Sequence, residues 1–327
     1  MTASSFRRGV CAALLIFVFV STARADDTAG YPNRPIHMIV PVATGGSNDV
    51  LARLIGEKLA SRLGQPVLCE NKAGAATMLG TAYAAHAAPN GYTLLMAPTA
   101  ALAVNPAVYD SLSYDPRHDF VPISLIGTFP LILVVNKAVP AHSVRELVDY
   151  AKAHPRQVNA GGAAATFQLV TELFKQKTGA PIEYIGYKGS NETAAAVLSG
   201  ELTMAIVDAG PISAQLKAGT VRGLAVTAPT RVAAFPDLPT MAEAGLTDMV
   251  VLGWSGIVAP AGTPAAIVKQ LQDQLIAIVK SPDISAKLRA LDLDPVGSTS
   301  DAFQRIIDTD VARWQAVAAA AHIKLKL

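Results

Sequence analysis

A short stretch near residue 45 has the residue types of an anion-binding turn. The sequence PVATGGSND, residues 41–49, places Gly45 and Gly46 between the apolar run 36–40 and a regular helical pattern. A strand that leads through glycines into a helix presents free backbone N–H groups, and such groups bind anions. The candidate chemistry is therefore anion binding, and the open question is which anion the turn holds.

The turn lacks the side chains of a nucleotide site. Residues 44–47 have neither the Lys nor the spacing of a P-loop, and the third glycine of a dinucleotide fingerprint is missing. A carboxylate remains a good candidate, because helix-start amides hold it without Arg or Lys. We expect Asp49 to turn back onto loop amides, although contact with a ligand ammonium group is the alternative. Asp208 lies at the end of a predicted strand, and the same two roles, a structural hydrogen-bond acceptor or a ligand contact, are open for it.

Catalytic and metal-binding patterns are weak. Residues 253–256, Gly-Trp-Ser-Gly, do not have the spacing of a G-x-S-x-G nucleophile turn. The six His residues are scattered, and none pairs with another ligand at metal-binding spacing. We therefore predict a protein that is not an enzyme and needs no metal or cofactor. An exported hydrolase that uses Ser255 or Ser47 stays open as a less favoured alternative.

The N-terminus has the layout of a secretory signal peptide, with Arg7 and Arg8, an apolar run over residues 9–20, and a small-residue site before Asp26. We predict a signal peptide over residues 1–25 and an exported mature chain. The apolar run is shorter than the roughly 20 residues that a transmembrane helix needs. Cleavage would leave Cys69 as the remaining cysteine, expected to be a buried, inert thiol. The formal net charge is +2 with no basic cluster, so we expect no nucleic-acid partner.

The mature part alternates short β-branched runs with longer helical patterns, which favours βαβ units and mostly parallel sheets. Apolar residues at three- and four-residue spacing predict the clearest helices. We expect Ser47 to be the N-cap of the first helix and Gly64 its C-terminal stop. The predicted helices cover residues 50–63, 144–153, 169–177, 267–279 and 303–320.

A second stretch repeats the plan of the first. A strand, Gly161-Gly162, a helix, Gly-x-Pro and another strand follow in the same order as around Gly46. Two such units would face each other across a cleft lined by N–H donors, because ligands of open α/β sheets lie at the carboxyl ends of the strands. Chance similarity of two ordinary βαβ units is the alternative.

The length and the connecting segments predict two lobes. About 300 residues remain after cleavage, which suits two domains. The apolar stretch 127–137 is predicted to carry the chain out of the first lobe, and the apolar stretch 245–264 is predicted to carry it back. We predict a discontinuous first lobe, a second lobe inserted into it, and a hinge where the two crossings lie. The predicted bounds are 26–130 plus 254–327 for the first lobe, 131–253 for the second, and 128–132 and 250–256 for the crossings.

The chain resembles the Bug/TctC family of periplasmic solute-binding proteins. Matching stretches run almost from end to end, among them YPNRPIHMIVPVATGGSNDVLARLI, GQPVLCENKAGA, YKGSNETAAAVLSGEL and WSGIVAPAGTP. The resemblance implies an α/β, two-lobed periplasmic binding fold of type II, a Venus flytrap, that closes on a small carboxylate. It also implies the periplasm as location, membrane permease subunits of a tripartite tricarboxylate-type transporter as partners, and a monomer. A ligand-sensing accessory protein for a receptor is the alternative.

The resemblance also implies the ligand-binding residues, carried over position by position. In the first lobe they are Ala43, Thr44, Gly45, Gly46, Ser47, Asp49, Ala76, Thr77, Met78, Thr99 and Ala100. In the second lobe they are Gly162, Ala163, Ala164, Ala165, Thr166 and Gln168. Asp208 is a further candidate ligand-binding residue because of its position at the end of a predicted strand.

The predicted ligand-binding residues of the second lobe depart from the family pattern. Where the family has a Ser, then a Gly-Ser pair and then a His, this chain has Ala160, Ala164, Ala165 and Gln168. Backbone amides still serve there, since any residue but Pro supplies an N–H. Fewer polar side chains favour a ligand with an apolar or aromatic body over a compact dicarboxylic amino acid.

Overall fold

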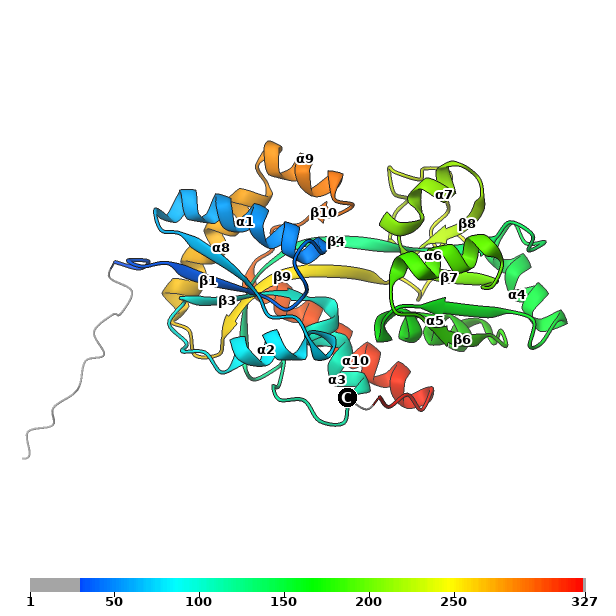
Figure 1. The fold of residues 1–327 in the computed structure, drawn as a ribbon, viewed down its shortest axis with the longest axis horizontal. Helices are drawn as coiled ribbons and strands as arrows, with labels where there is room; N and C mark the ends of the chain where they lie inside the picture. The colour runs from blue at the N-terminus through cyan, green and yellow to red at the C-terminus, as the bar shows by residue number, and fades with distance from the viewer. Residues whose placement is uncertain (1–29, 326–327) are drawn as a thin grey trace, which may run out of the picture.

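The computed structural model describes residues 30–325, so the predicted signal peptide lies outside the described residues. Two α/β lobes lie side by side along the longest axis, and two long strands run between them (Figure 1). The predicted two-lobed α/β architecture is confirmed.

The first lobe contains a parallel β2-β1-β3 unit with helices on both faces. Apolar side chains of α1 and α8 pack on one face of this unit and form a core with β1. The strands are β1 (Ile36–Val40), β2 (Val67–Asn71), β3 (Thr93–Pro98) and the short β10 (Asp294–Pro295). The helices are α1 (Ser47–Leu63), α2 (Met78–Ala85), α3 (Asn105–Val108), α8 (Ala265–Val279) and α9 (Pro282–Ala290), with the short turns η1 (Ala75–Thr77) and η2 (Ala100–Val104).

The second lobe has its own small sheet, in which β5 lies parallel to β6 and to β7. Its strands are β5 (Asn159–Gly162), β6 (Glu183–Gly186), β7 (Met204–Asp208) and β8 (Val221–Val226). Its helices are α4 (Val144–Ala153), α5 (Ala165–Thr178), α6 (Ser190–Ser199) and α7 (Ser213–Lys217), with the short turn η3 (Gly210–Ile212).

The lobes are joined by β4 (Phe120–Asn136) and β9 (Leu252–Pro260). Up to Pro130, β4 pairs with β9, and from Leu131 onward it pairs with β7 and β8. Every pair that includes β4 or β9 is antiparallel, whereas the other strand pairs are parallel. The expectation of mostly parallel sheets is therefore wrong, because the chain crosses between lobes as strands that enter both sheets in the opposite direction.

Helix α10 (Ser300–Ala320) lies against both lobes. Its side chains Phe303 and Trp314 belong to the same hydrophobic cluster as Leu169 and Phe174 of α5. The amide of Gln176 also donates to the carbonyl of Val317 at 3.3 Å. The lobes therefore share a continuous apolar core on the α10 side, and the opposite side is left open for a cleft.

The predicted helices are confirmed, with two differences at the first one. Helix α1 begins at Ser47, so Gly46 rather than Ser47 is the N-cap, and no side chain caps it. The Ser47 hydroxyl is consequently free for other contacts. Gly64 ends the helix with φ +70°, as expected of a C-terminal glycine. Cys69 is half-buried rather than buried, and burial raises the pKa of its thiol.

Asp49 ties the turn before α1 to its surroundings. Its side chain is 3% exposed, and it accepts hydrogen bonds from the Gly45 N–H at 2.8 Å and the Asn71 amide at 2.9 Å. Arg53 forms an ion pair with it at 2.9 Å. The hydrogen bond from Arg53 is the largest reason why the pKa of Asp49 falls to about 2. The expectation that Asp49 turns back onto loop amides is confirmed.

Trp254 of β9 ties this crossing strand to α10. Its indole N–H donates to the Asp310 carboxylate at 2.8 Å, and its ring meets Phe303 edge-on at 5.2 Å between centroids. Burial raises the pKa of Asp310, and the Trp254 hydrogen bond and the Arg313 charge oppose that rise. Because a buried carboxylate needs such partners, Trp254 and Asp310 depend on each other.

Replacing Asp49 by Ala is expected to lower the free energy of unfolding by about 1–3 kcal/mol, because the Gly45 and Asn71 donors lose their acceptor. The pKa of Asp49 is lower in the folded protein than its ordinary value of 3.8. Its contribution is therefore present above pH 4 and disappears as the pH falls toward 2. Urea unfolding at pH 7 and pH 2.5 measures both effects. An equal deficit at the two pH values would contradict this account.

Replacing Trp254 by Phe is expected to cost about 1–3 kcal/mol at pH 7, because the buried Asp310 carboxylate loses its indole donor. The double variant W254F/D310N should recover part of that loss, since a neutral amide is cheaper to bury than a carboxylate. Urea unfolding of the two single variants and the double variant gives the coupling between the positions. Strict additivity would show that the hydrogen bond contributes nothing.

Candidate ligand site between the lobes

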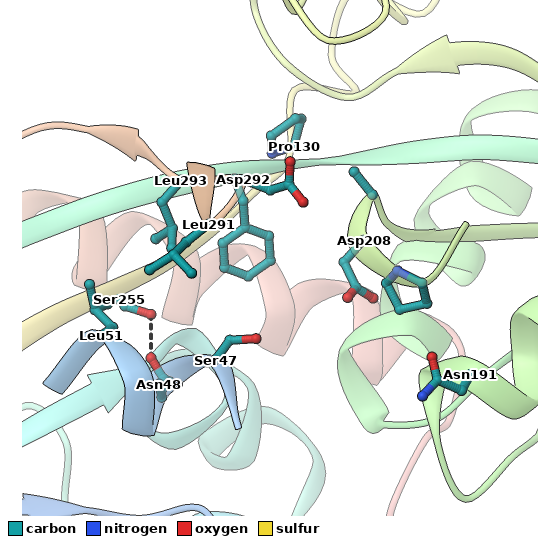
Figure 2. Close-up of a pocket in the computed structure, with 14 residues that line it drawn as sticks. Ser47, Asn48, Leu51, Pro130, Asn191, Asp208, Ser255, Leu291, Asp292 and Leu293 are labelled. Carbon is teal, nitrogen blue, oxygen red and sulfur yellow. Dashed lines mark hydrogen bonds between the residues drawn. The ribbon is translucent and has the colours of Figure 1, made fainter. Parts of the chain in front are cut away.

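A cavity of about 390 Å³ lies between the lobes (Figure 2). The start of α1, the crossing strands and the α9–β10 connection form its first-lobe side. The end of β7, the η3 turn and the start of α6 form its second-lobe side. Both lobes therefore contribute to one space, as a clamp on a ligand requires.

The first-lobe wall presents hydrogen-bond donors. Ser255, which is 4% exposed, donates its hydroxyl to the Asn48 side-chain oxygen at 2.6 Å (Figure 2). This bond fixes the Asn48 amide, and its NH₂ group meets no acceptor among residues 30–325. The wall also includes Ser47, the first residue of α1.

The free helix-start amides are not the ones that the glycines suggest. The Gly45 N–H donates to Asp49 at 2.8 Å, and the Gly46 N–H donates to the Ala43 carbonyl at 3.3 Å. The backbone N–H groups of Ser47 and Asn48 come next, and they have no acceptor within the described part of the chain. The first N–H groups of a helix lack intrahelical partners, so the available donors lie one to two residues beyond the Gly-Gly pair.

The second-lobe wall is acidic. Asp208 ends β7, and its carboxylate accepts a hydrogen bond from the Ser190 hydroxyl at 3.3 Å. Burial raises the pKa of Asp208, and the nearby charge of Asp292 adds to the rise. Asp292 belongs to the first lobe and reaches toward the second, since a Cβ placed on Gly210 would lie 3.9 Å from its carboxylate.

A smaller, mostly apolar cavity of about 130 Å³ adjoins the larger one. The two share Asn48, Phe129 and Ser255 as lining residues. Its other walls include Phe167, Leu252, Trp254 and Trp314. The Phe129 ring rests on Gly253, where any Cβ would overlap the ring. The larger cavity therefore leads into an apolar side pocket.

Five of the predicted ligand-binding residues line these cavities. Ser47 and Asp208 line the larger one, and Thr99, Ala100 and Thr166 line the side pocket. The others line neither, and their roles stay predictions. In the first lobe they are the exposed residues before α1 (Ala43, Thr44, Gly45 and Gly46), the buried Asp49, and the residues at and just before the start of α2 (Ala76, Thr77 and Met78). In the second lobe they are the residues around the start of α5 (Gly162, Ala163, Ala164, Ala165 and Gln168).

Two of these positions already have other contacts. Both oxygens of Asp49 are engaged by Gly45, Arg53 and Asn71, and the Met78 side chain is 3% exposed within the core. A role for either in binding would therefore be indirect or through the backbone. Residues 75–77 have φ between +46° and +77°, and the Asn105 amide holds this turn through the Ala76 carbonyl at 2.8 Å.

Sequence reasoning missed the centre of the site. Asn48, Phe129 and Ser255 line both cavities, and Asn191 and Asp292 line the larger one. Asn48 stands inside the quoted turn, so its helix-start position was a usable signal. Ser255 enters the sequence-based hypotheses only as the nucleophile of a hydrolase. Nothing in the local sequence marks Phe129 or Asp292, because their positions depend on the crossing of the chain between lobes.

Within residues 30–325, no group of three or more His, Cys, Asp or Glu is arranged to hold a metal ion. In the same range, no helix has both the length and the apolar character that crossing a bilayer requires.

Comparison with known proteins places these features in a family. The model of the tripartite tricarboxylate transporter family receptor, TctC, matches residues 51–323. The protein BugT of Bordetella pertussis is 37% identical over 322 residues, which is 95% of this chain and 98% of BugT.

Solved structures agree with this result. Rpa4515 of R. palustris, determined with adipate, is 35% identical with a TM-score of 0.78, covering 90% of this chain and 99% of that one. MatC (Rpa3494) of Rhodopseudomonas palustris, with bound malate, is 28% identical with a TM-score of 0.73, covering 88% and 99%. The expected two-lobed periplasmic binding fold is confirmed, and the chain belongs to the TctC (Bug) family of periplasmic solute-binding proteins.

Proposed function

We propose that this protein is exported to the periplasm, where it captures a small organic carboxylate as a monomer. It delivers the ligand to membrane permease subunits of a tripartite tricarboxylate-type transporter. The observation that carries the proposal is the cavity between the lobes, with the Asn48 amide fixed by Ser255 at the start of α1. Relatives solved with adipate and malate support a carboxylate as the ligand class.

The first-lobe wall meets the physical need of a bound carboxylate. Removing a carboxylate from water is costly unless hydrogen bonds replace those it loses. The Asn48 NH₂ group, the Ser47 hydroxyl and the helix-start N–H groups of Ser47 and Asn48 supply donors from one direction. The partial positive charge at the start of α1 adds to the attraction.

Closure follows from the placement of the walls. We assign residues 26–130 and 254–327 to the first lobe, 131–253 to the second, and the hinge to 128–132 and 250–256. The change of β4 partners between Pro130 and Leu131 supports this hinge. A ligand that contacts both lobes binds the closed form best and so shifts the population toward it.

The side pocket favours an acid with an apolar or aromatic body. Its volume of about 130 Å³ is close to that of an engineered apolar cavity of about 150 Å³ that binds benzene. Phe129, Phe167 and Trp254 are among its walls. An apolar body placed there would leave the acid group near Asn48, which lines both spaces.

Binding is favoured over catalysis. Ser255 donates its hydroxyl to Asn48 instead of to a base, and neither cavity has a His in its lining. The family and the fold are those of binding proteins. We therefore assign Ser255 the role of holding Asn48 in place.

For an acid found by thermal-shift screening, N48A is expected to weaken binding at least tenfold, because a hydrogen bond to a charged group is lost. S255A should weaken it about threefold to tenfold, since the Asn48 amide becomes free to turn away. Titration calorimetry measures both. Ser111→Ala, an exposed position outside the lining of both cavities, is the matched control. Unchanged affinity in N48A would show that the acid group lies elsewhere.

G253A tests the side pocket. The new methyl group displaces the Phe129 ring, since no room exists between them. Binding of 3-phenylpropanoate should fall at least fivefold, an estimate that corresponds to about 1 kcal/mol, whereas malate should be affected less. Calorimetry with both acids decides the matter, with thermal melting to verify folding. Equal losses for the two acids would contradict an apolar body in this pocket.

A further inference from the structure

We propose that the acid taken by this cleft also carries a positively charged nitrogen, which Asp208 and Asp292 bind from opposite lobes. This inference rests on the proposed function, because it concerns the same cavity and specifies its ligand further. The predicted ligand is thus a zwitterion with one carboxylate and one ammonium or similar cationic group.

The charged side chains that line the cavity are all acidic. Figure 2 draws 14 residues that line it; Asp208 and Asp292 are among them, and Lys, Arg and His are not. Among the described residues, Asp208 accepts one side-chain hydrogen bond, from the Ser190 hydroxyl at 3.3 Å, and Asp292 forms no ion pair. The half-buried Asp208 and the exposed Asp292 thus line this space, and its lining contains no cationic side chain to balance them.

The hydrogen-bond donors and the carboxylates that line the cavity come from different elements. Ser47 and Asn48 supply donors from α1. Asp208 lies across the cavity on the second-lobe side, and Asp292 lies beside Leu291 and Pro130 (Figure 2). A ligand with a carboxylate at each end would bring a third negative charge close to the two aspartates. An ammonium group at that end meets opposite charges, and the Phe129 ring in the same lining offers a face that attracts cations.

The available space suits a ligand of this kind. The cavity volume of about 390 Å³ equals the volume that on the order of a dozen water molecules occupy in liquid water. A ligand of amino-acid size therefore fits within the cavity, whose lining includes both the start of α1 and the end of β7.

The two aspartates also couple the charge of the ligand to closure. Asp208 lies on β7 of the second lobe, whereas Asp292 follows α9 of the first. Their mutual repulsion grows as the lobes approach, so the empty protein favours the open form. A cation between them removes the repulsion and makes closure depend on the ligand.

Matched pairs of ligands test the proposal on the full mature chain. In each pair one carboxylate is replaced by an ammonium group: adipate against 5-aminopentanoate, and benzylmalonate against phenylalanine. Titration calorimetry at pH 7 should show at least tenfold tighter binding of the amino acid in one pair. The double variant D208N/D292N should reduce that preference to threefold or less. Asp294→Asn, an exposed carboxylate two residues from Asp292 and outside the cavity lining, is the control and should keep the preference.

The outcomes separate the two levels of the proposal. Tighter binding of the dicarboxylate in both pairs, equal affinities, or a preference that survives in D208N/D292N would overturn this inference and leave the proposed function standing. If none of the four acids binds, and a wider screen of carboxylic acids finds none, the proposed function itself fails. Thermal melting of each variant verifies that a lost preference does not come from unfolding.

Discussion

The structure depends on the pairing of β4 with β9, because these strands are the continuous secondary structure that passes from one lobe to the other. β4 satisfies its backbone groups with β9 in the first lobe and with β7 and β8 in the second. Since buried backbone N–H and C=O groups must be paired, neither lobe completes its sheet without the crossing strands. The proposed hinge at this crossing would therefore leave both sheets intact, while α10 and its apolar contacts join the two lobes.

The turn before α1 illustrates how a loop is held rigid without large side chains. Asp49 uses both carboxylate oxygens to hold Gly45, Asn71 and Arg53, and Asn71 in turn donates to the Val42 carbonyl at 3.1 Å. The amides of the two glycines are used within the turn, so the donors that remain are those of the next two residues. Glycine is needed here for conformation, since Gly45 has φ +85°. The Gly-Gly pair thus shapes the site, and Ser47 and Asn48 present the donors.

Local patterns predicted the elements well, because apolar periodicity and Gly or Pro stops act within a few residues. Helix α4 begins and ends where the spacing places it, and α8 and α10 extend only a few residues beyond their predicted starts. The site was harder to predict, since its centre joins Asn48 to Ser255, 207 residues apart in the chain. Asp292 enters the cavity only because α9 ends beside the crossing strands, with φ +58° at this residue. Such contacts follow from topology, and a single sequence carries no local signal for them.

The candidate site and the crossing strands coincide, so the proposed binding would act directly on the proposed hinge. Phe129 and Pro130 line the cavity, and the partner change of β4 lies directly after them. The donors of α1 and the carboxylate of Asp208 stand on opposite sides of that point, so any rotation there changes the distance between the two walls. A ligand long enough to reach both walls is held fully only at one angle between the lobes. Under the proposed function, the contacts that select the ligand are therefore also the contacts that set the closed form, and a transport partner would recognise occupancy from the lobe arrangement alone.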